Sequence, residues 1–300
     1  NDGDGGGLCL SYGARQVELY GCVIENNRAL NGGGLCLVND RDGNYYPRVN
    51  MYGVTVSGNT ARLYGGGVYC SGTGGLTAVY CSPADGYSSC AVIGNKAKDG
   101  GGIYSEATVN MKAAVFTGNT ASGKGGGAYV AAGSIIRRFE LADCTVADNI
   151  AGETSSTAIY LAGGYSTLGG GKFSGGIYKA NGSTLNLNGS MPDFKDAEFV
   201  LPEIASSGTT LVDTVTGFSL TADAATGLNI AYGVAAVNGA KIIVLRKIAN
   251  ITLDFGNGSV VVQTECGKYV LPERADGLDE NVYIGKWSAD DKDYFAGDTV

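Results

Sequence analysis

Short runs of alternating apolar and polar residues recur along the first half of the chain. The runs at residues 17–24, 49–56, 109–116 and 139–146 align without gaps, and in each the alternation slips by one residue near the middle. Alternation with a period of two is typical of a β-strand with one buried face. Both halves of a run can face the same interior only if the chain turns at the slip. Each run therefore predicts two short strands joined by a corner.

A second motif recurs in phase with these runs: Asn-x-Ala, then a glycine triplet and an apolar residue. The copies read "NRALNGGGLC" from Asn27, "NTARLYGGGVY" from Asn59, "NKAKDGGGIY" from Asn95 and "NTASGKGGGAY" from Asn119. A fifth copy from Asn149, "NIAGETSSTAIY", keeps the frame without the triplet. The motif predicts a third strand in each repeat, with these residues pointing inward: Leu8, Leu35, Val68, Ile103, Ala128, Ile159 and Ile177.

The repeats differ in length, since successive motif asparagines are 32, 36, 24 and 30 residues apart. We place the variation in residues 39–48 and 71–89, after the third strand, so the loops are expected to leave at one edge. Insertions on one side of a regular repeat are the signature of a solenoid. The sequence therefore predicts an all-β, three-sided solenoid over residues 1–190, irregular last coils or a β-rich cap over 191–250, and a small C-terminal β-module over 251–300.

Stacking such repeats at the strand spacing of about 4.8 Å would bring the motif asparagines into one column. Stacked amides can hydrogen-bond along a column and stabilise stacked strands. Asparagine also tolerates left-handed backbone at turns, so the alternative is that each residue acts alone at its corner. The predicted structural ladder consists of Asn27, Asn59, Asn95, Asn119 and Asn149.

The repeat elements carry a family resemblance. The segments "FTGN" (116–119), "VSGN" (56–59) and "VADN" (146–149), paired with the glycine triplets, resemble the repeats of chlamydial polymorphic outer-membrane proteins and related bacterial surface adhesins. The resemblance covers about residues 1–180 and implies a right-handed parallel β-helix. The autotransporter barrel of that family is not evident, so the resemblance implies nothing about attachment.

The last fifty residues resemble a Listeria-Bacteroides repeat, a small extracellular β-module. Gly267, Leu271, Pro272, Gly285 and the only tryptophan, Trp287, match that module, as does the closing "AGDTV", whereas the middle segment diverges. The resemblance implies a modular protein on a bacterial surface, of which this chain would be a monomeric fragment.

Composition excludes some classes of partner. The chain has 21 Lys and Arg against 29 Asp and Glu, a net charge of −8, and no histidine. Nucleic-acid binding draws on clustered Lys and Arg, so no nucleic-acid partner is expected. No apolar run approaches the roughly 18 to 20 residues of a membrane span, so no membrane insertion is expected.

Residues 118–124, "GNTASGK", match most of a phosphate-binding loop, in which glycine amides hold phosphates and the lysine reaches the terminal phosphoryl group. Gly125 stands where a Ser or Thr would hold Mg²⁺, and Lys124 occurs in only one of the five copies. We interpret the segment as one structural copy of the repeat and expect no nucleotide binding and no cofactor.

An enzymatic function is an alternative, because β-helices include pectin lyases and glycosidases. The absence of histidine removes Ser-His-Asp arrangements and histidine zinc ligands. A glycosidase needs two carboxyls roughly 5 to 10 Å apart. In the expected outward column, Glu18 and Glu140 are separated by coils carrying Asn50 and Asn110. A non-catalytic function is expected, and the alternative is a β-helical polysaccharide lyase, a glycosidase or a tailspike-like depolymerase.

A metal site is not expected either. Asp40, Asp42 and Asn44 alternate oxygen side chains as calcium loops do, but no bidentate glutamate follows. A solvated turn is the favoured interpretation, and these three residues are weak calcium candidates.

Five of the eight cysteines fall into two groups. Cys22, Cys90 and Cys144 occupy one inward column, and we interpret them as small apolar core residues too far apart to bond to one another. Cys9 and Cys36 share an outward position on adjacent coils, within disulfide reach. The sequence leaves open whether they are bonded.

The outward position of the third strand offers a candidate binding face. Aromatic rows can bind sugar rings or anchor protein contacts, although tyrosine also suits a plain β-surface. We expect an extracellular, cell-surface bacterial protein whose β-helix is a stalk or adhesin for a host or microbial glycan or surface protein. Its candidate contact residues are Tyr69, Tyr104, Tyr129, Tyr160 and Tyr178.

Overall fold

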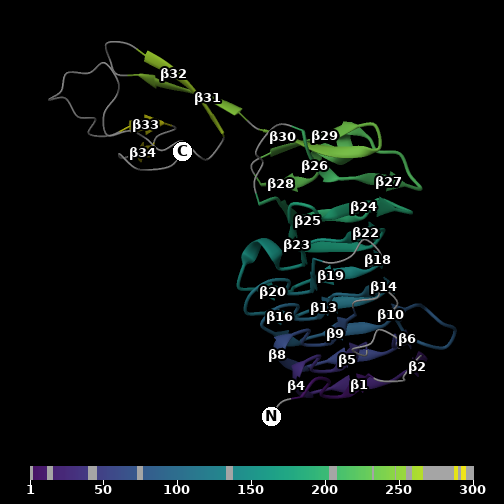
Figure 1. The fold of residues 1–300 in the computed structure, drawn as a ribbon. Helices are drawn as coiled ribbons and strands as arrows, with labels where there is room; N and C mark the ends of the chain where they lie inside the picture. Colours follow the sequence, from purple (N-terminus) through teal and green to yellow (C-terminus); the bar gives the residue numbers. More distant parts are fainter. Residues whose placement is uncertain are drawn as a thin grey trace.

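Short strands stack in parallel along one axis in the computed structural model of the chain (Figure 1). The structure describes residues 3–11, 16–39, 46–72, 77–132, 138–202, 208–231, 233–246, 248–254, 259–265, 287–289 and 292–294. Within these ranges, helix is limited to α1 (Ala222–Thr226) and the 3₁₀ segment η1 (Thr154–Ser156). The fold is a parallel β-helix, as the sequence predicts.

A complete coil contains four short strands, which stack on those of neighbouring coils to form four walls. The first wall consists of β2 (Gln16–Tyr20), β6 (Arg48–Tyr52), β10 (Ala78–Cys81), β14 (Thr108–Lys112), β18 (Arg138–Ala142), β22 (Tyr165–Gly169), β24 (Thr184–Asn188) and β27 (Thr214–Thr216). The second wall consists of β3 (Val23–Glu25), β7 (Thr55–Ser57), β11 (Ala91–Ile93), β15 (Val115–Thr117) and β19 (Thr145–Ala147).

The third wall directly follows the motif asparagines and consists of β4 (Arg28–Asn31), β8 (Thr60–Tyr64), β12 (Lys96–Ala97), β16 (Thr120–Ala121) and β20 (Ile150–Ala151). The sequence predicts only a connection there, so this strand is an addition to the expected three. The fourth wall follows the glycine triplets and consists of β1 (Leu8–Leu10), β5 (Leu35–Val38), β9 (Val68–Ser71), β13 (Ile103–Ser105), β17 (Ala128–Val130) and β21 (Ile159–Leu161).

The corner between the first and second walls lies at the phase slip, as predicted. Its residues have left-handed backbone, with φ of 53° at Ala113 and 54° at Asp143. The next corner precedes the third wall, and there the left-handed residue comes immediately before the motif asparagine, with φ of 62° at Gly58 and 65° at Gly118. The motif asparagine therefore does not itself supply the left-handed turn.

The residues predicted to face inward on the fourth wall form the core. Leu35, Val68, Ile103, Ile159 and Ile177 have no exposed surface and are paired in register from coil to coil. The first and second walls add the large buried side chains of Phe116, Phe139 and Leu141. Burial of apolar surface at about 25 cal/mol per Å² is the main term holding such coils together.

The second and fourth walls meet in one long strand, β23 (Lys172–Lys179). Its first residue, Lys172, pairs with Thr145 of β19, and its later residue Ile177 pairs with Ile159 of β21. One strand therefore replaces the separate second, third and fourth strands of earlier coils. Parallel pairing then continues through β25 (Asp193–Val200) to β28 (Asn229–Ile230).

An antiparallel sheet covers the C-terminal end of the coils (Figure 1). It consists of β26 (Thr209–Val212), β29 (Gly233–Asn238) and β30 (Lys241–Arg246). Leu211 and Ile242 of this sheet belong to the same apolar cluster as Phe199 of β25. The sheet thus covers core that an open solenoid end would expose.

A buried lysine ties this sheet to the last coils. Lys179 is 7% exposed, and its Nζ donates to the Thr210 carbonyl at 2.9 Å and lies 3.4 Å from Asp213 Oδ2. The Asp213 carboxylate also accepts the Leu185 backbone N–H at 2.9 Å. Beyond this sheet, the described residues form two antiparallel hairpins: β31 (Ile248–Asp254) with β32 (Ser259–Glu265), and β33 (Trp287–Ala289) with β34 (Lys292–Tyr294).

Residues 71–89 differ from the prediction. Part of this segment is β10, a first-wall strand paired on one side with β6 and on the other with β14. The extra length in this coil lies partly in residues 82–89, at the corner between the first and second walls. The expectation that all loops leave at one edge is therefore wrong, because "AVYC" (78–81) is a first-wall strand and not part of an insertion.

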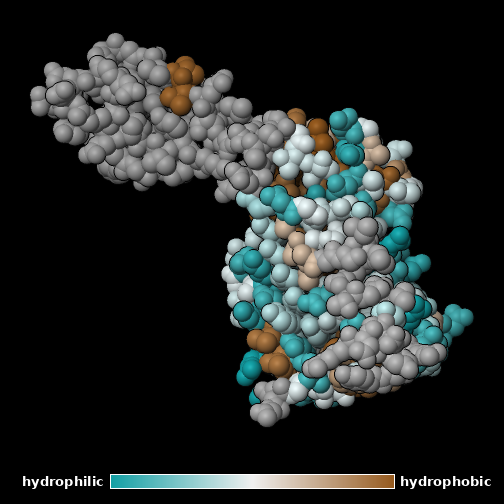
Figure 2. Space-filling view, viewed as in Figure 1, coloured by the Kyte–Doolittle hydropathy of each residue, from teal (hydrophilic) through white to brown (hydrophobic). Residues whose placement is uncertain are grey.

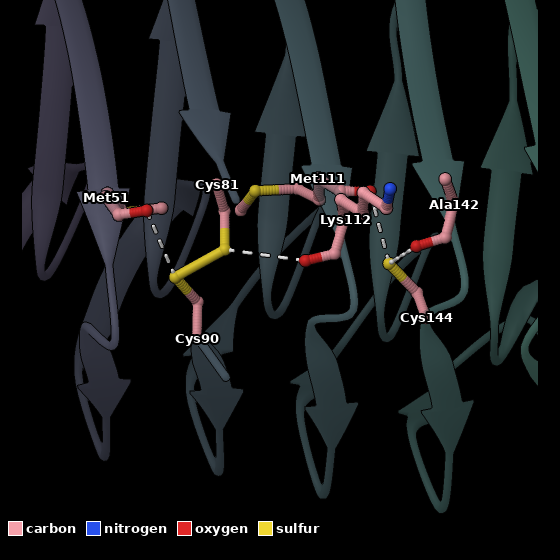
Figure 3. Close-up of a disulfide and its surroundings, with 7 residues drawn as sticks. All are labelled: Met51, Cys81, Cys90, Met111, Lys112, Ala142 and Cys144. Carbon is pink, nitrogen blue, oxygen red and sulfur yellow. Dashed lines mark hydrogen bonds between the residues drawn. A yellow bond between two sulfur atoms is a disulfide. The ribbon is translucent and has the colours of Figure 1, made fainter. Parts of the chain in front are cut away.

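A disulfide closes this loop and corrects the interpretation of Cys90. Cys90 is bonded to Cys81, with 6.6 Å between the Cα atoms (Figure 3). Both cysteines are 1% exposed. Cys144, two coils further on, is a buried free thiol that donates to the Met111 carbonyl at 3.3 Å, as expected of a core cysteine. The repeat pattern does not predict this bond, because it does not mark Cys81 as a strand residue.

Candidate functional site

The five motif asparagines form one hydrogen-bonded column along the corner between the second and third walls. At each step, the backbone N and the side-chain Nδ2 of one asparagine both donate to Oδ1 of the next, at 2.9 to 3.1 Å. Nδ2 also donates to a carbonyl of the preceding coil, as from Asn95 to Val56 at 2.9 Å. The column runs through Asn27, Asn59, Asn95, Asn119 and Asn149.

The three central asparagines of this column leave no room and no free amide group for a ligand. Asn59, Asn95 and Asn119 have no exposed surface, and their amides are occupied by neighbouring coils. A Cβ at Gly67 would lie 3.0 Å from Asn95 Nδ2 and 2.7 Å from the Gly102 carbonyl oxygen. Glycine at this position lets the fourth wall approach the amides closely, so the asparagine and glycine motifs serve the same packing.

The five candidate tyrosines share one column on the outer face of the fourth wall and its continuation in β23. They are paired in register from Tyr69 to Tyr178. From Tyr104 onwards successive ring centroids are 4.7 to 4.9 Å apart with interplanar angles of 3° to 18°. Each ring therefore lies against the face of the next.

Stacking leaves little aromatic face open to solvent. Tyr104 and Tyr160 are each 8% exposed. Tyr64, from the third wall, adds a ring 4.5 Å from that of Tyr104, and Lys124 Nζ lies 4.6 Å from the Tyr160 ring centroid. A sugar ring stacks on an exposed aromatic face. In this column most faces are occupied by other tyrosines, which favours the alternative of a structural surface ladder.

Burial in this column changes the acidity of its hydroxyls. Loss of hydration raises the pKa of Tyr69 to about 12, and it also raises the pKa of Tyr104 and Tyr129 above the usual value for tyrosine. The neutral phenol is therefore the form that the folded column stabilises.

The same column begins with two cysteines. Cys9 and Cys36 are register partners, and Cys36 in turn pairs with Tyr69. Both are free thiols, Cys9 exposed and Cys36 with no exposed surface. Burial and the neighbouring thiol of Cys9 raise the pKa of Cys36 above its usual value.

The segment that matches a phosphate-binding loop uses its amides within the solenoid. The backbone N of Lys124 donates to Asp99 Oδ1 at 2.9 Å. Gly125 N donates to Ser156 Oγ and Gly126 N to the Ser156 carbonyl, both at 3.2 Å. Amides that would hold a phosphate are thus bonded to adjacent coils.

The lysine of this segment is engaged as well. Lys124 Nζ donates to the Tyr160 hydroxyl at 3.1 Å and lies 3.5 Å from the Glu153 carboxylate. The hydrogen bond with Tyr160 raises the pKa of Lys124. The charged group of Lys124 therefore binds side chains of the next coil.

The outer face of the first wall carries a groove that the sequence did not predict. The groove has a volume of about 390 Å³ and crosses β18, β22, β24 and β27. Its lining is mostly polar and includes Arg138, Glu140, Tyr165, Thr167, Asn186 and Thr214. The alternation "TLNLN" at 184–188 continues the first-wall pattern within the predicted solenoid, but a hollow on its outer face depends on side chains from four strands, which that pattern does not show.

The same wall carries an exposed aromatic cluster at its N-terminal end. The rings of Tyr20 and Tyr52 stack at 4.7 Å, and Tyr87, from the disulfide-closed loop, lies 5.5 Å from Tyr20. Tyr20 is 46% and Tyr87 43% exposed. The Tyr20 hydroxyl donates to Glu18 at 2.6 Å, and this bond raises the pKa of Tyr20 to about 12.

Apolar side chains do not gather into a broad patch on the face of the coils seen in Figure 2, where apolar colour is confined to small separate spots. Among the described residues, no group of three or more His, Cys, Asp or Glu could hold a metal ion. The calcium candidates Asp40, Asp42 and Asn44 lie outside the described residues. No helix in the described part of the chain is long and apolar enough to cross a membrane.

Comparison with known proteins identifies the repeat. Residues 113–131 match the family model described as the Chlamydia polymorphic membrane protein (Chlamydia_PMP) repeat. The matched stretch runs from the corner at Ala113, through Asn119 and its glycine triplet, to β17. No curated protein and no solved structure gives a significant match to the chain.

The fold and this match together define the class: a parallel β-helix that carries a repeat of a bacterial surface-protein type. The residues on which the second resemblance rests, Gly267, Leu271, Pro272 and Gly285, lie outside the described part of the chain, and Trp287 begins β33.

Proposed function

We propose that the protein is a non-catalytic protein of the bacterial cell surface, whose β-helix acts as a rigid stalk and adhesive surface for a glycan or protein ligand. The observation that carries this proposal is the repeat of residues 113–131, which matches a family of bacterial membrane proteins and recurs as stacked coils. We further propose that residues 251–300 are an extracellular β-module of the Listeria-Bacteroides type.

Rigidity follows from how the coils are joined. One continuous apolar cluster runs from Leu10 in β1 to Val244 in β30. The asparagine column and the tyrosine column run alongside it, each linking successive coils. A rod of this kind holds surface side chains in fixed positions, so a ligand does not have to order them on binding.

The first wall is the best candidate for the adhesive face. Its outer surface carries the exposed Tyr20 and Tyr87 at one end and the groove beside Tyr165 at the other. The tyrosine column of the fourth wall is less suited to this role, because its rings cover one another.

A polysaccharide-degrading enzyme is the alternative function. Among the described residues that line the groove, Glu140 is the one carboxylate, and its Oε2 accepts a hydrogen bond from Asn110 at 2.9 Å. Glycoside hydrolysis uses a pair of carboxyl groups. A single acid beside hydroxyl and amide groups supports binding over hydrolysis.

Adhesion and turnover assays test the proposal together. Beads coated with the full chain are expected to be retained on an array of glycans and extracellular-matrix proteins, whereas beads coated with heat-unfolded chain are not. Antibodies against the coils are expected to label intact source cells. Absence of retention on every surface, together with release of reducing or unsaturated sugar ends from polysaccharides, would show that the protein is an enzyme instead.

A further inference from the structure

The groove on the first wall combines an exposed aromatic ring with hydrogen-bonding side chains from adjacent coils. We propose that it is an oligosaccharide-binding site, with Tyr165 as the stacking ring and Arg138, Glu140 and Asn186 as hydrogen-bonding groups. This inference rests on the proposed function, because surface display is what would expose the groove to glycans.

Parallel register fixes the positions of these groups. Arg138 pairs with Tyr165, and Glu140 pairs with Thr167, which pairs with Asn186. Successive coils lie about 4.8 Å apart, so the lining forms two short rows of side chains at regular spacing. A chain of sugar units presents hydroxyl groups at repeated intervals, and regularly spaced polar rows can contact several of them together.

Three of the groups have hydrogen-bonding capacity to spare. Asn186 Oδ1 accepts from the Thr214 hydroxyl at 2.6 Å, which leaves its Nδ2 directed to other acceptors. Glu140 Oε2 accepts from Asn110, and its other carboxylate oxygen is left to accept from a ligand. The side chain of Arg138 is exposed and forms no hydrogen bond or ion pair with the described residues. Sugar hydroxyls donate and accept, so they can satisfy all three groups.

Side-chain volume falls along the outermost column of the first wall towards the coils that carry the groove. In the outermost column of the first wall, Tyr20 and Tyr52 pair with each other near its start, whereas Lys112 is followed by Ala142 and then by Gly169. A side chain at 169 would collide with the carbonyl oxygen of Asn188, so the glycine is required there. The bulky surface thus ends where the groove begins.

The chemistry of the lining favours a saccharide over other ligands. One positive and one negative side chain give no net charge to attract a polyanion such as nucleic acid. A peptide that binds through apolar side chains would need an apolar anchor pocket, and the groove offers mainly amides, hydroxyls and the ring of Tyr165, which is 41% exposed. An aromatic ring beside hydroxyl-binding groups suits a sugar, which has one C–H face and polar edges.

The experiment uses the full chain and soluble tetrasaccharides of three classes: neutral hexose, N-acetylhexosamine and uronate. Calorimetry is expected to show binding of at least one class. Tyr165→Ala is expected to weaken that binding about tenfold, as for loss of one stacking contact. Thr214→Val is expected to have a similar effect, because the Thr214 hydroxyl donates to Asn186 Oδ1 and holds the Asn186 amide in position. Arg138→Ala is expected to weaken uronate binding most, which distinguishes acidic from neutral ligands. Gln16→Ala is the matched control, since Gln16 occupies the column of Arg138 at the far end of the wall.

The urea midpoint of each variant shows whether it is folded. Because positions 165 and 214 are both exposed, the two variants test the binding site independently of each other. The absence of binding by all three classes overturns the assignment, and so does equal binding by wild type and both folded variants. Bead adhesion that persists in these variants, or retention on proteins alone, would refute the groove while leaving the adhesin proposal intact.

Discussion

Asn95 gives two hydrogen bonds to a single oxygen of Asn119, one from its backbone N at 3.1 Å and one from Nδ2 at 3.0 Å. Neither side chain has exposed surface. A third bond joins Asn95 Nδ2 to the Val56 carbonyl at 2.9 Å, so one amide connects three coils.

Asn95→Ala is expected to destabilise the β-helix by about 1 to 3 kcal/mol, because it leaves buried partners on both sides without their hydrogen bonds. Urea denaturation followed by circular dichroism measures the change. Asn50→Ala is the control, since Asn50 lies on the partly exposed outer face of the first wall. Equal losses of unfolding free energy from the two substitutions would show that the asparagine column stabilises the fold no more than an asparagine on the outer face does.

The repeat could be predicted from sequence because each of its features has a strict physical cause. Inward residues such as Ile103 recur with the strand period, and Asn95 and Gly67 recur because each coil makes the same close contact. The disulfide between Cys81 and Cys90 could not be found this way. Its strand lacks the usual spacing to the asparagine motif, so the register that brings the two cysteines together was not visible in the sequence.

The disulfide is expected to stabilise the protein by about 2 to 3 kcal/mol, the value for closing a loop of roughly ten residues. Reduction should lower the urea midpoint of the wild type. The Cys81→Ser, Cys90→Ser variant should start at the lower midpoint and should not respond to the reductant. A wild type that is unaffected after full reduction, verified by thiol titration, would contradict the expectation.

The tyrosine column predicts a loss of stability at alkaline pH. The folded state raises the pKa of Tyr69 from 10.0 to about 12 and raises that of Tyr104 as well, both mainly by burial. Below about pH 10 the tyrosine hydroxyls keep their protons in both the folded and the unfolded chain, so the column makes its full contribution to stability. Above it the unfolded chain ionises first, so stability falls between pH 10 and about 12.

Urea midpoints at about pH 8 and about pH 11 measure this loss. Tyr104→Phe is expected to lose less of its stability over that interval than the wild type, because the phenyl ring has no proton to release. Tyr165→Phe, at an exposed position, should behave as the wild type does. Identical pH profiles for all three proteins would refute the role of burial.

Neither ATP nor GTP is expected to bind at residues 118–124. The amides that a phosphate would need already donate to Asp99 and Ser156, and Gly125 supplies no hydroxyl for Mg²⁺. Calorimetry with each nucleotide and Mg²⁺ should therefore give no heat of binding. Mg²⁺-dependent binding that Lys124→Ala abolishes would overturn this prediction.

The sequence predicts that the tyrosines share one column but not how their rings are arranged. Alternation along a strand shows that Tyr129 points outward, whereas its exposure depends on the neighbouring rings of Tyr104 and Tyr160. Likewise, the groove beside Tyr165 arises from side-chain sizes across four strands. Such features depend on register between distant segments, which a single sequence shows only where the motif is intact.

The asparagine column makes the coils interchangeable. Every step repeats the same bonds, whether the partners are separated by 24 residues, as for Asn95 and Asn119, or by 36, as for Asn59 and Asn95. Removing one whole coil, residues 95–118, would let Asn59 meet Asn119 with the geometry it now has with Asn95. Gain and loss of coils by recombination would then change the length of the rod while the bonds of the asparagine column stay the same.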